Sequence, residues 1–159
     1  MIINSRKPHN YISLMVWIIT LVSIGYILGY LMKKDLNHWY YTLHRSSLTP
    51  PGYVIGMVWT FLYILLGTAG WWIWGEKRFK TLQSLYLLQL VLNWTWSPMF
   101  FNFHWILPAF LSILLNVFCV GRIILLSFVK IPAVAFLLLP YFFWLLFAGY
   151  LNFYIWYFN

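Results

Sequence analysis

The chain of 159 residues is 64% hydrophobic and only 8% charged, with a mean hydropathy of +0.80. Soluble domains carry about 25% charged residues, so this composition excludes an ordinary soluble protein. The formal charge of +8 comes from ten Lys and Arg residues against two acids. Because the basic residues lie at the ends of apolar segments, they are explained by membrane anchoring, and no nucleic-acid partner is expected.

Five apolar segments predict an all-α fold, an integral membrane bundle of five transmembrane helices in a single domain over residues 1–159. A membrane span needs about 20 predominantly apolar residues, and each segment supplies roughly that length. The connections are short except the first, a polar loop over residues 33–50. The predicted helices cover residues 11–32, 51–74, 81–101, 105–128 and 133–157.

The first segment follows Arg6 and Lys7, a basic start that resembles a signal peptide. Its apolar run is too long for one and lacks a small-residue cleavage site, so an uncleaved helix is expected. Gly25 and Gly29 form a GxxxG spacing, which lets a second helix approach closely. That spacing favours packing within the chain, with a dimer seam as the alternative.

The second segment begins after Pro50 and Pro51, which suit the start of a helix, with Thr49 as the candidate N-cap. Small and aromatic residues then recur at spacings of three and four, on one side of the expected helix. They would line a slot for a planar ligand, or they would serve ordinary helix packing. These residues are Gly56, Trp59, Tyr63 and Gly67.

The third segment carries Gln89, Asn93 and Trp96 at i, i+4 and i+7, so a helix places them on one face. A polar amide in hydrocarbon must find a partner or cost several kcal/mol. This face should therefore look at other protein or at a cavity that holds a polar, flat molecule. Pro98 is expected to break the helix, with Pro108 on the far side of the break.

The last two segments add further polar positions. Arg122 lies about two turns from the end of its helix and would reach the interface, or serve as an internal cation for an acidic ligand. Lys130 and Pro132 predict a tight turn. After it, one helix face presents Trp144, Ala148 and Asn152.

Charge counts predict the orientation of the bundle. With five spans, the N-terminus and the second and fourth loops share one side, which holds six basic residues, whereas the other side holds three. Cytoplasmic loops are enriched in Lys and Arg, so the N-terminus is expected in the cytoplasm.

Residues for acid–base or metal chemistry are scarce. The two acids, Asp35 and Glu76, fall in expected loops, and none of the four histidines pairs with another at helical spacing. The lone Cys119 forms no metal-type spacing. No catalytic residue, metal site or obligatory cofactor is expected. An aromatic interior with a few amides and hydroxyls predicts a binding site for a large, flat, mostly apolar molecule.

Four stretches of the sequence resemble the TspO/MBR family, the tryptophan-rich sensory proteins that are also called translocator or peripheral benzodiazepine receptor proteins. The family's loop, second-helix, third-helix and last-helix signatures occur in order. They are WYYTLHRSSLTPP at 39–51, GMVWTFLY at 56–63, LNWTWSPMFF at 92–101 and PYFFWLLFAGYLNFYIW at 140–156.

The resemblance implies a five-helix membrane bundle that binds porphyrins in a pocket closed by the first loop, in animal members also cholesterol. By similarity, Trp59, Asn93 and Trp144 line the pocket, Tyr40 approaches it from the loop, and Ala148 leaves room beside the ring. Trp faces stack on porphyrins, and propionates prefer a cation, for which His44 and Arg45 are the candidates. The full expected ligand set is Tyr40, Arg45, Trp59, Tyr63, Asn93, Trp96, Trp144, Ala148 and Asn152.

The chain also departs from the family pattern. Arg45-Ser46 stands where the family has Lys-Pro, which keeps the charge, loses one rigid turn and puts the order of the loop in question. Ser112 stands where the family has an acid. Tyr154 is followed by no basic residue, so the cholesterol-recognition pattern is absent, and porphyrin is favoured over sterol.

The resulting hypothesis is a membrane protein that binds a tetrapyrrole such as protoporphyrin IX or a haem-type ligand, in transport, sensing or a stress response. Two alternatives stay open: light- or oxygen-dependent porphyrin breakdown, and a packing subunit of a larger membrane complex. An enzymatic role is less expected than a binding role. The expected setting is the bilayer of a bacterial cell envelope, with a homodimer possible.

Overall fold

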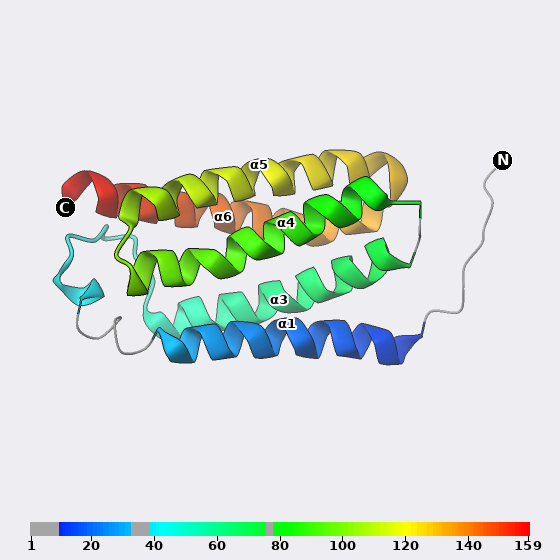
Figure 1. Cartoon of the computed structure of the whole chain (residues 1–159), viewed down its shortest axis with the longest axis horizontal. Helices are drawn as coiled ribbons and strands as arrows, with labels where there is room; N and C mark the ends of the chain where they lie inside the picture. Colours follow the sequence, from blue (N-terminus) through cyan, green and yellow to red (C-terminus); the bar gives the residue numbers. More distant parts are fainter. Residues whose placement is uncertain (1–9, 33–38, 76–77) are drawn as a thin grey trace.

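The computed structural model describes residues 10–32, 39–75 and 78–159, and within these ranges it contains helices and no strand. The all-α prediction is therefore confirmed for this part of the chain. In order, the elements are α1 (Tyr11–Leu31), the short 3₁₀ helix η1 (Tyr40–Thr42), α3 (Gly52–Trp74), α4 (Lys80–Ser97), the π-helical turn η2 (Pro98–Asn102), α5 (Ile106–Lys130) and α6 (Pro132–Phe158) (Figure 1). Outside the described ranges lie Arg6, Lys7, His9, Lys33, Lys34, Asp35, His38, Glu76 and Lys77.

Four of the described helices, α1, α3, α5 and α6, are long and apolar enough to cross a bilayer. The prediction of five spans is thus confirmed in part. The exception is α4, which has 18 residues and carries polar side chains along its length, including Gln83, Gln89 and Asn93. Helix α4 packs along α5, and Figure 1 shows it running beside the apolar helices.

The bundle consists of two groups of helices. Helix α1 packs mainly on α3, whereas α5 packs extensively on both α6 and α4. Figure 1 shows α1 and α3 as one layer and α4, α5 and α6 as the other. The two groups meet where α3 faces α6 and α4, across fewer contacts than hold each group together. This junction is called the α3 seam below.

Glycine on α1 allows one close approach across the first layer. A Cβ on Gly25 would overlap the ring of Tyr63 on α3, whereas a Cβ on Gly29 would meet nothing within 4 Å. The GxxxG spacing therefore serves packing within the chain at its first glycine. Its second glycine has open space beside it.

The third helix breaks at the expected place: α4 ends at Ser97, and from Pro98 the chain continues as the π-helical turn η2, in which the Phe103 N–H donates to the Pro98 carbonyl at 3.0 Å. A π turn accommodates a residue that cannot donate to the preceding turn. The expected cap of the second helix is wrong. Thr49 is not an N-cap: its N–H donates to Ser46, and α3 starts at Gly52 after Pro51. The predicted turn at Lys130 and Pro132 is confirmed, with one residue between the helices.

Candidate functional site

Aromatic rings from α3 and α6 meet across the α3 seam. Trp59 lies edge to face with Trp144, with ring centroids 6.4 Å apart and planes at 87°. It also lies 5.6 Å from Tyr63 on its own helix and 6.4 Å from Tyr141 on α6. Edge-to-face and tilted pairs at these distances are favourable arrangements of aromatic quadrupoles. The structure therefore brings together three of the predicted ligand residues, Trp59, Tyr63 and Trp144, from two helices.

A chain of hydrogen bonds lies beside these rings and joins four helices. The Tyr63 hydroxyl donates to Asn93 Oδ1 at 2.8 Å, and Asn93 Nδ2 donates to the Tyr141 hydroxyl at 2.9 Å. Asn116 Nδ2 donates to the same hydroxyl at 3.1 Å. All four residues are buried. The amide of Asn93 is thus satisfied by protein in this structure, and the Tyr63–Asn93 bond is a polar link across the α3 seam.

Tyr141 and Asn116 were missed as members of this set by sequence reasoning. Asn116 was recognisable as an amide inside an apolar helix, and Tyr141 as part of the last-helix motif. Nothing in their spacing showed that both would reach Asn93, because that depends on how α5 and α6 sit against α4.

In the described structure, Asn116 Oδ1 and both amide atoms of the 1% exposed Gln89 find no partner. The polar face of α4 is therefore only partly satisfied.

A second aromatic cluster packs where the described part of the first loop, residues 39–50, meets the end of α4. Tyr40 lies edge to face with Phe100 at 6.1 Å and with Phe101 at 5.6 Å, and Trp96 stacks on Phe100 at 5.3 Å. Residues 39–50 are called the lid loop below. The lid loop therefore rests on the η2 turn through its own aromatic side chain.

Arg45 is the cation of the lid loop. Its guanidinium carbon lies 5.1 Å from the Tyr40 ring centroid and 4.8 Å from that of Tyr41, both within the range of a cation–π contact. Burial raises the pKa of the Tyr40 hydroxyl, and the positive charge of Arg45 partly opposes that rise. A positive charge is thus held over the aromatic cluster at the mouth of the bundle.

Asn152 ties α6 to the same cluster. The Trp96 indole N–H donates to Asn152 Oδ1 at 3.0 Å, and Asn152 Nδ2 donates to the Ile106 carbonyl at 3.0 Å. Ala148 lies half-buried one turn before Asn152 and one turn after Trp144, on the α6 face that they share. The predicted ligand residues therefore fall into two groups, one at the α3 seam and one under the lid loop. The α4 and α6 faces connect these groups.

Hydrogen bonds from Ser46 and His44 hold the lid loop in place. Ser46 is buried, its Oγ lies 3.0 Å from the Tyr150 hydroxyl, and it accepts from the Leu48 N–H at 3.1 Å. Asn159 adds a paired contact: His44 N–H donates to its Oδ1 at 2.9 Å, and its Nδ2 donates to the His44 carbonyl at 3.2 Å. The lid loop is thus fastened to α6 at two places. The His44 side chain is exposed.

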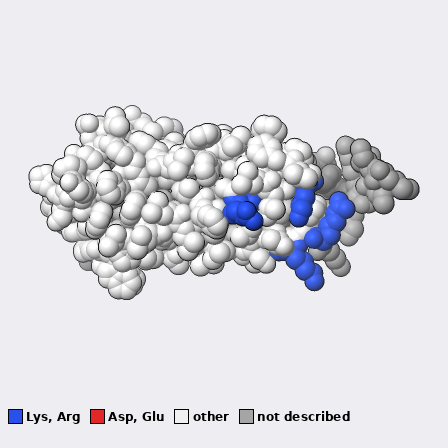
Figure 2. Space-filling view, turned by 90° about the horizontal axis from the view of Figure 1, so that it is seen from above, with Lys and Arg blue, Asp and Glu red and all other residues white. Residues whose placement is uncertain are grey.

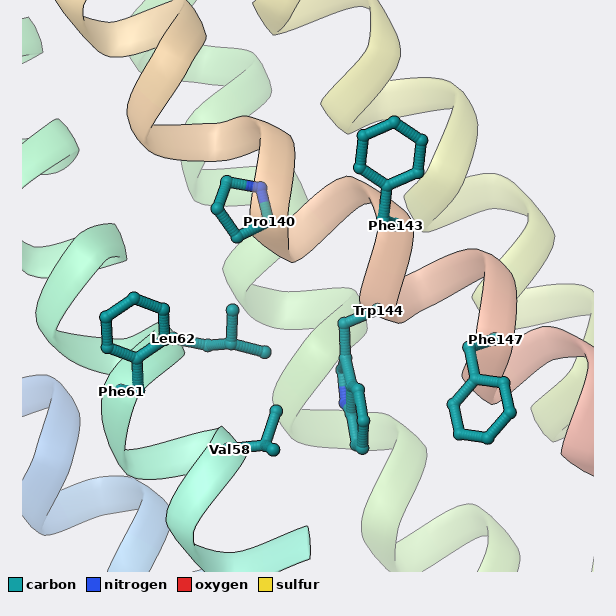
Figure 3. A pocket seen from close by; sticks show the side chains of 7 residues that line it. All are labelled: Val58, Phe61, Leu62, Pro140, Phe143, Trp144 and Phe147. Carbon is teal, nitrogen blue, oxygen red and sulfur yellow. The ribbon is translucent and has the colours of Figure 1, made fainter. Parts of the chain in front are cut away.

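A groove of about 320 Å³ opens on the outer side of the α3 seam, and Figure 3 shows the Trp144 ring standing between the two helices that form it. Pockets for drug-sized molecules span about 300–1,000 Å³, so this groove is at the lower limit. Its walls are almost entirely apolar. They consist of Val58, Phe61, Leu62, Pro140, Phe143, Trp144 and Phe147.

Comparison with known proteins matches a model of the TspO/MBR family to residues 16–157. The chain belongs to the TspO/MBR family. It is similar to the tryptophan-rich protein TspO of Archaeoglobus fulgidus, with 31% identity over 94% of this chain and 99% of the relative. It is also similar to the translocator protein of Bos taurus, with 32% identity over 86% and 84% of the two chains. A third relative, the tryptophan-rich protein TspO of Chlorobaculum tepidum, is 34% identical over 83% and 86% of the two chains.

Membership of the TspO/MBR family and the apolar helices together make this an integral membrane protein. On α5, the Ser112 hydroxyl is enclosed with no hydrogen-bond partner among the described residues. The serine therefore contributes no observed polar link of its own. In this chain the links between α4, α5 and α6 come from the asparagines and Tyr141.

Proposed function

We propose that this protein binds a tetrapyrrole between the α3 seam and the lid loop, for transport, sensing or a stress response. The observation that carries the proposal is the meeting of Trp59 and Trp144 across the seam, with Asn93 beside them. Two indoles and an amide suit the flat aromatic ring and polar nitrogens of a porphyrin. The relatives named tryptophan-rich proteins belong to the same family.

The mouth of the proposed site suits the acidic edge of such a ligand. Porphyrins of the protoporphyrin type carry two propionates beside an apolar ring. Arg45 supplies a guanidinium that can bind a carboxylate through two parallel hydrogen bonds. Because Arg45 belongs to the lid loop, its pairing with a propionate would couple ligand binding to closure of that loop.

The ligand would enter by parting the α3 seam. In this structure the seam is closed, with the two tryptophans in contact and Asn93 bonded to Tyr63. The seam lies between the two helix groups, so a ligand would enter there without unpacking either group. The outer groove beside Trp144 marks where packing between α3 and α6 is already incomplete.

A titration with protoporphyrin IX, followed by the shift of its Soret band, tests the proposal. Each ring that stacks on the ligand contributes about tenfold in affinity, so Trp59→Ala and Trp144→Ala should each weaken binding by about that factor. Trp156→Ala is the matched control, because Trp156 lies on the outer side of α6 and is 41% exposed. Equal affinity in the Trp59→Ala/Trp144→Ala double variant would remove the basis for the assignment.

A second titration separates loss of the site from loss of folding. The dimethyl ester of the porphyrin lacks the charges that Arg45 would bind. Arg45→Gln should therefore weaken binding of the diacid and leave binding of the diester unchanged. If both ligands lose affinity equally, Arg45 does not act on the propionates.

Light-dependent breakdown of the porphyrin is tested by illuminating the bound complex and measuring the porphyrin spectrum. A protein that only binds the porphyrin leaves that spectrum unchanged.

For the orientation, we propose a cytoplasmic N-terminus in a bacterial cell envelope, with the lid loop on the opposite side. Lys80 and Lys130 mark one end of the described bundle and Arg45 the other. A Cys119→Ser background with Lys130→Cys or Ser47→Cys, labelled in intact cells with an impermeant maleimide, tests this orientation. Only the Ser47→Cys site should be labelled.

The outer face of α1, exposed along most of its length, offers the surface for the proposed homodimer.

A further inference from the structure

Helix α5 carries an arginine within its outward-facing stripe. Arg122 is exposed. At 100° per residue it falls within the arc formed by the exposed apolar residues of this helix, towards one edge of that arc. The flanking side chains are large and open: Phe118 is 65% exposed, Leu125 63% and Val129 88%. In a protein that spans a bilayer, this stripe faces lipid.

Arg122 also lies below the membrane surface. Helix α5 has 25 residues, which gives a length of about 37 Å against a hydrocarbon core of about 30 Å. Arg122 precedes Lys130 by eight residues, or about 12 Å, so its backbone lies roughly 8 Å inside the hydrocarbon boundary when the helix is centred. A guanidinium at that depth requires a counter-charge or hydrogen-bond acceptors.

The geometry of the helix works against escape to the nearer interface. Cα–Cβ bonds tilt towards the helix N-terminus, which for Arg122 means away from the Lys130 end and towards the bilayer centre. Within the described ranges there is no acidic residue, and none of the described hydrogen bonds involves Arg122. The chain's acids, Asp35 and Glu76, lie outside those ranges.

Other cations stand at the same end of the molecule. Lys130 ends α5 and Lys80 begins the neighbouring α4, and both side chains are exposed. Figure 2 shows the blue side chains gathered towards one end of the visible face, with no red among the described residues. This basic surface, defined by Lys80, Arg122 and Lys130, is complementary to negative charge.

We propose that the basic surface binds the phosphate of an anionic phospholipid such as phosphatidylglycerol. The planar guanidinium of Arg122 would hold two phosphate oxygens, and the lysines would add charge at the interface. The acyl chains would lie along the stripe beside Phe118 and Leu125. A free phosphate ion has no access to this depth in hydrocarbon. A second copy of the chain offers no acid among its described residues to meet the arginine.

Native mass spectrometry of the full chain from detergent tests the proposal. The protein is presented with equal amounts of phosphatidylglycerol and phosphatidylcholine that carry the same acyl chains, and the ratio of their adducts is measured. Wild type should favour phosphatidylglycerol. Arg122→Gln should lower that ratio about fivefold, the size expected for one basic residue beside an anionic leaflet. Arg122→Lys should fall between them, because it keeps the charge without the two-point geometry.

Tyr26→Gln is the control, because it places the same polar side chain at a 76% exposed position of α1, outside the basic surface, and should leave the adduct ratio unchanged. Circular dichroism of each variant confirms that its helices are intact. Millimolar inorganic phosphate should not displace the lipid; if it does, the site recognises phosphate without the acyl chains. An Arg122→Gln ratio equal to that of the wild type would overturn the proposal.

Discussion

Tyr63→Phe tests the polar link across the α3 seam. The hydroxyl of Tyr63 donates to Asn93 Oδ1 at 2.8 Å, and both residues are 6% exposed. Phenylalanine keeps the ring and its contact with Trp59, so the change removes one hydrogen bond and little packing. Asn93 keeps its bond to Tyr141 and loses a partner for its oxygen. Any effect therefore reports on this one bond.

The magnitude follows from the environment of the bond. Buried hydrogen bonds contribute about 0.5–1.5 kcal/mol in soluble proteins, and interhelical bonds in membranes average about 0.6 and reach about 1.7 kcal/mol. A loss of about 1 kcal/mol is therefore expected for Tyr63→Phe. For a chain of 159 residues, that corresponds to a fall in Tm of about 2–4 °C.

The expected effect on ligand affinity has the opposite sign. If a porphyrin enters by parting the α3 seam, the Tyr63–Asn93 bond must break first, and its energy opposes binding. Removing the bond raises the population of the open seam, so protoporphyrin IX should bind about three- to fivefold more tightly. A variant that is less stable yet binds more tightly would be the signature of a closed site that opens.

The assay combines thermal unfolding in detergent, read by circular dichroism, with a Soret titration of the same sample. Tyr53→Phe is the matched control, since Tyr53 lies on α3 and is 72% exposed. It should change neither Tm nor affinity. Weaker porphyrin binding by Tyr63→Phe with wild-type stability would refute the reasoning, because the hydroxyl would then act on the ligand rather than on the seam.

Three further outcomes are expected. Gly25→Ala should lower Tm by several degrees, because its Cβ would overlap the Tyr63 ring on α3. Gly29→Ala has open space around its Cβ and should match the wild-type Tm or exceed it slightly. Burial raises the pKa of Tyr40, so the neutral phenol stabilises the packed lid loop. The stabilisation is complete below the ordinary tyrosine pKa and is lost as the pH rises through the raised pKa of Tyr40. The pKa itself is measured by the absorbance of the ionised phenol at about 295 nm, with Tyr40→Phe as the reference. Arg45→Gln should raise this pKa further. Asn159→Ala removes both hydrogen bonds to the His44 backbone and should speed proteolysis within the lid loop; cleavage at the wild-type rate would show that this clamp does not hold the loop.

The apolar runs of the sequence predicted the class of the protein, and the resemblance to the family predicted the residues at the α3 seam. The apolar runs alone predict α1, α3, α5 and α6, because span length and side-chain hydropathy are local properties. The predicted neighbours Trp59, Tyr63, Asn93 and Trp144 do meet in the structure. Their predicted contact with a ligand stays a prediction.

The partners of the polar side chains were beyond a single sequence. Helical spacing places Gln89 and Asn93 on one face, yet Asn93 is fully bonded and Gln89 has no observed partner among the described residues. The difference arises because hydrogen bonding depends on which side chains the neighbouring helices present at that height. Tyr141 reaches Asn93 from α6, and no comparable donor reaches Gln89.

Local chemistry by itself therefore determined that this chain enters a bilayer, where its helices run and which of their faces are polar. Tertiary structure decided how those faces are used. It placed Gly25 against α3 and left Gly29 open, and it fastened Ser46 to α6. It also turned Arg122 outward, towards lipid. The physical reason is that burial and hydrogen bonding are properties of pairs of helices, and spacing along one helix does not specify its neighbour.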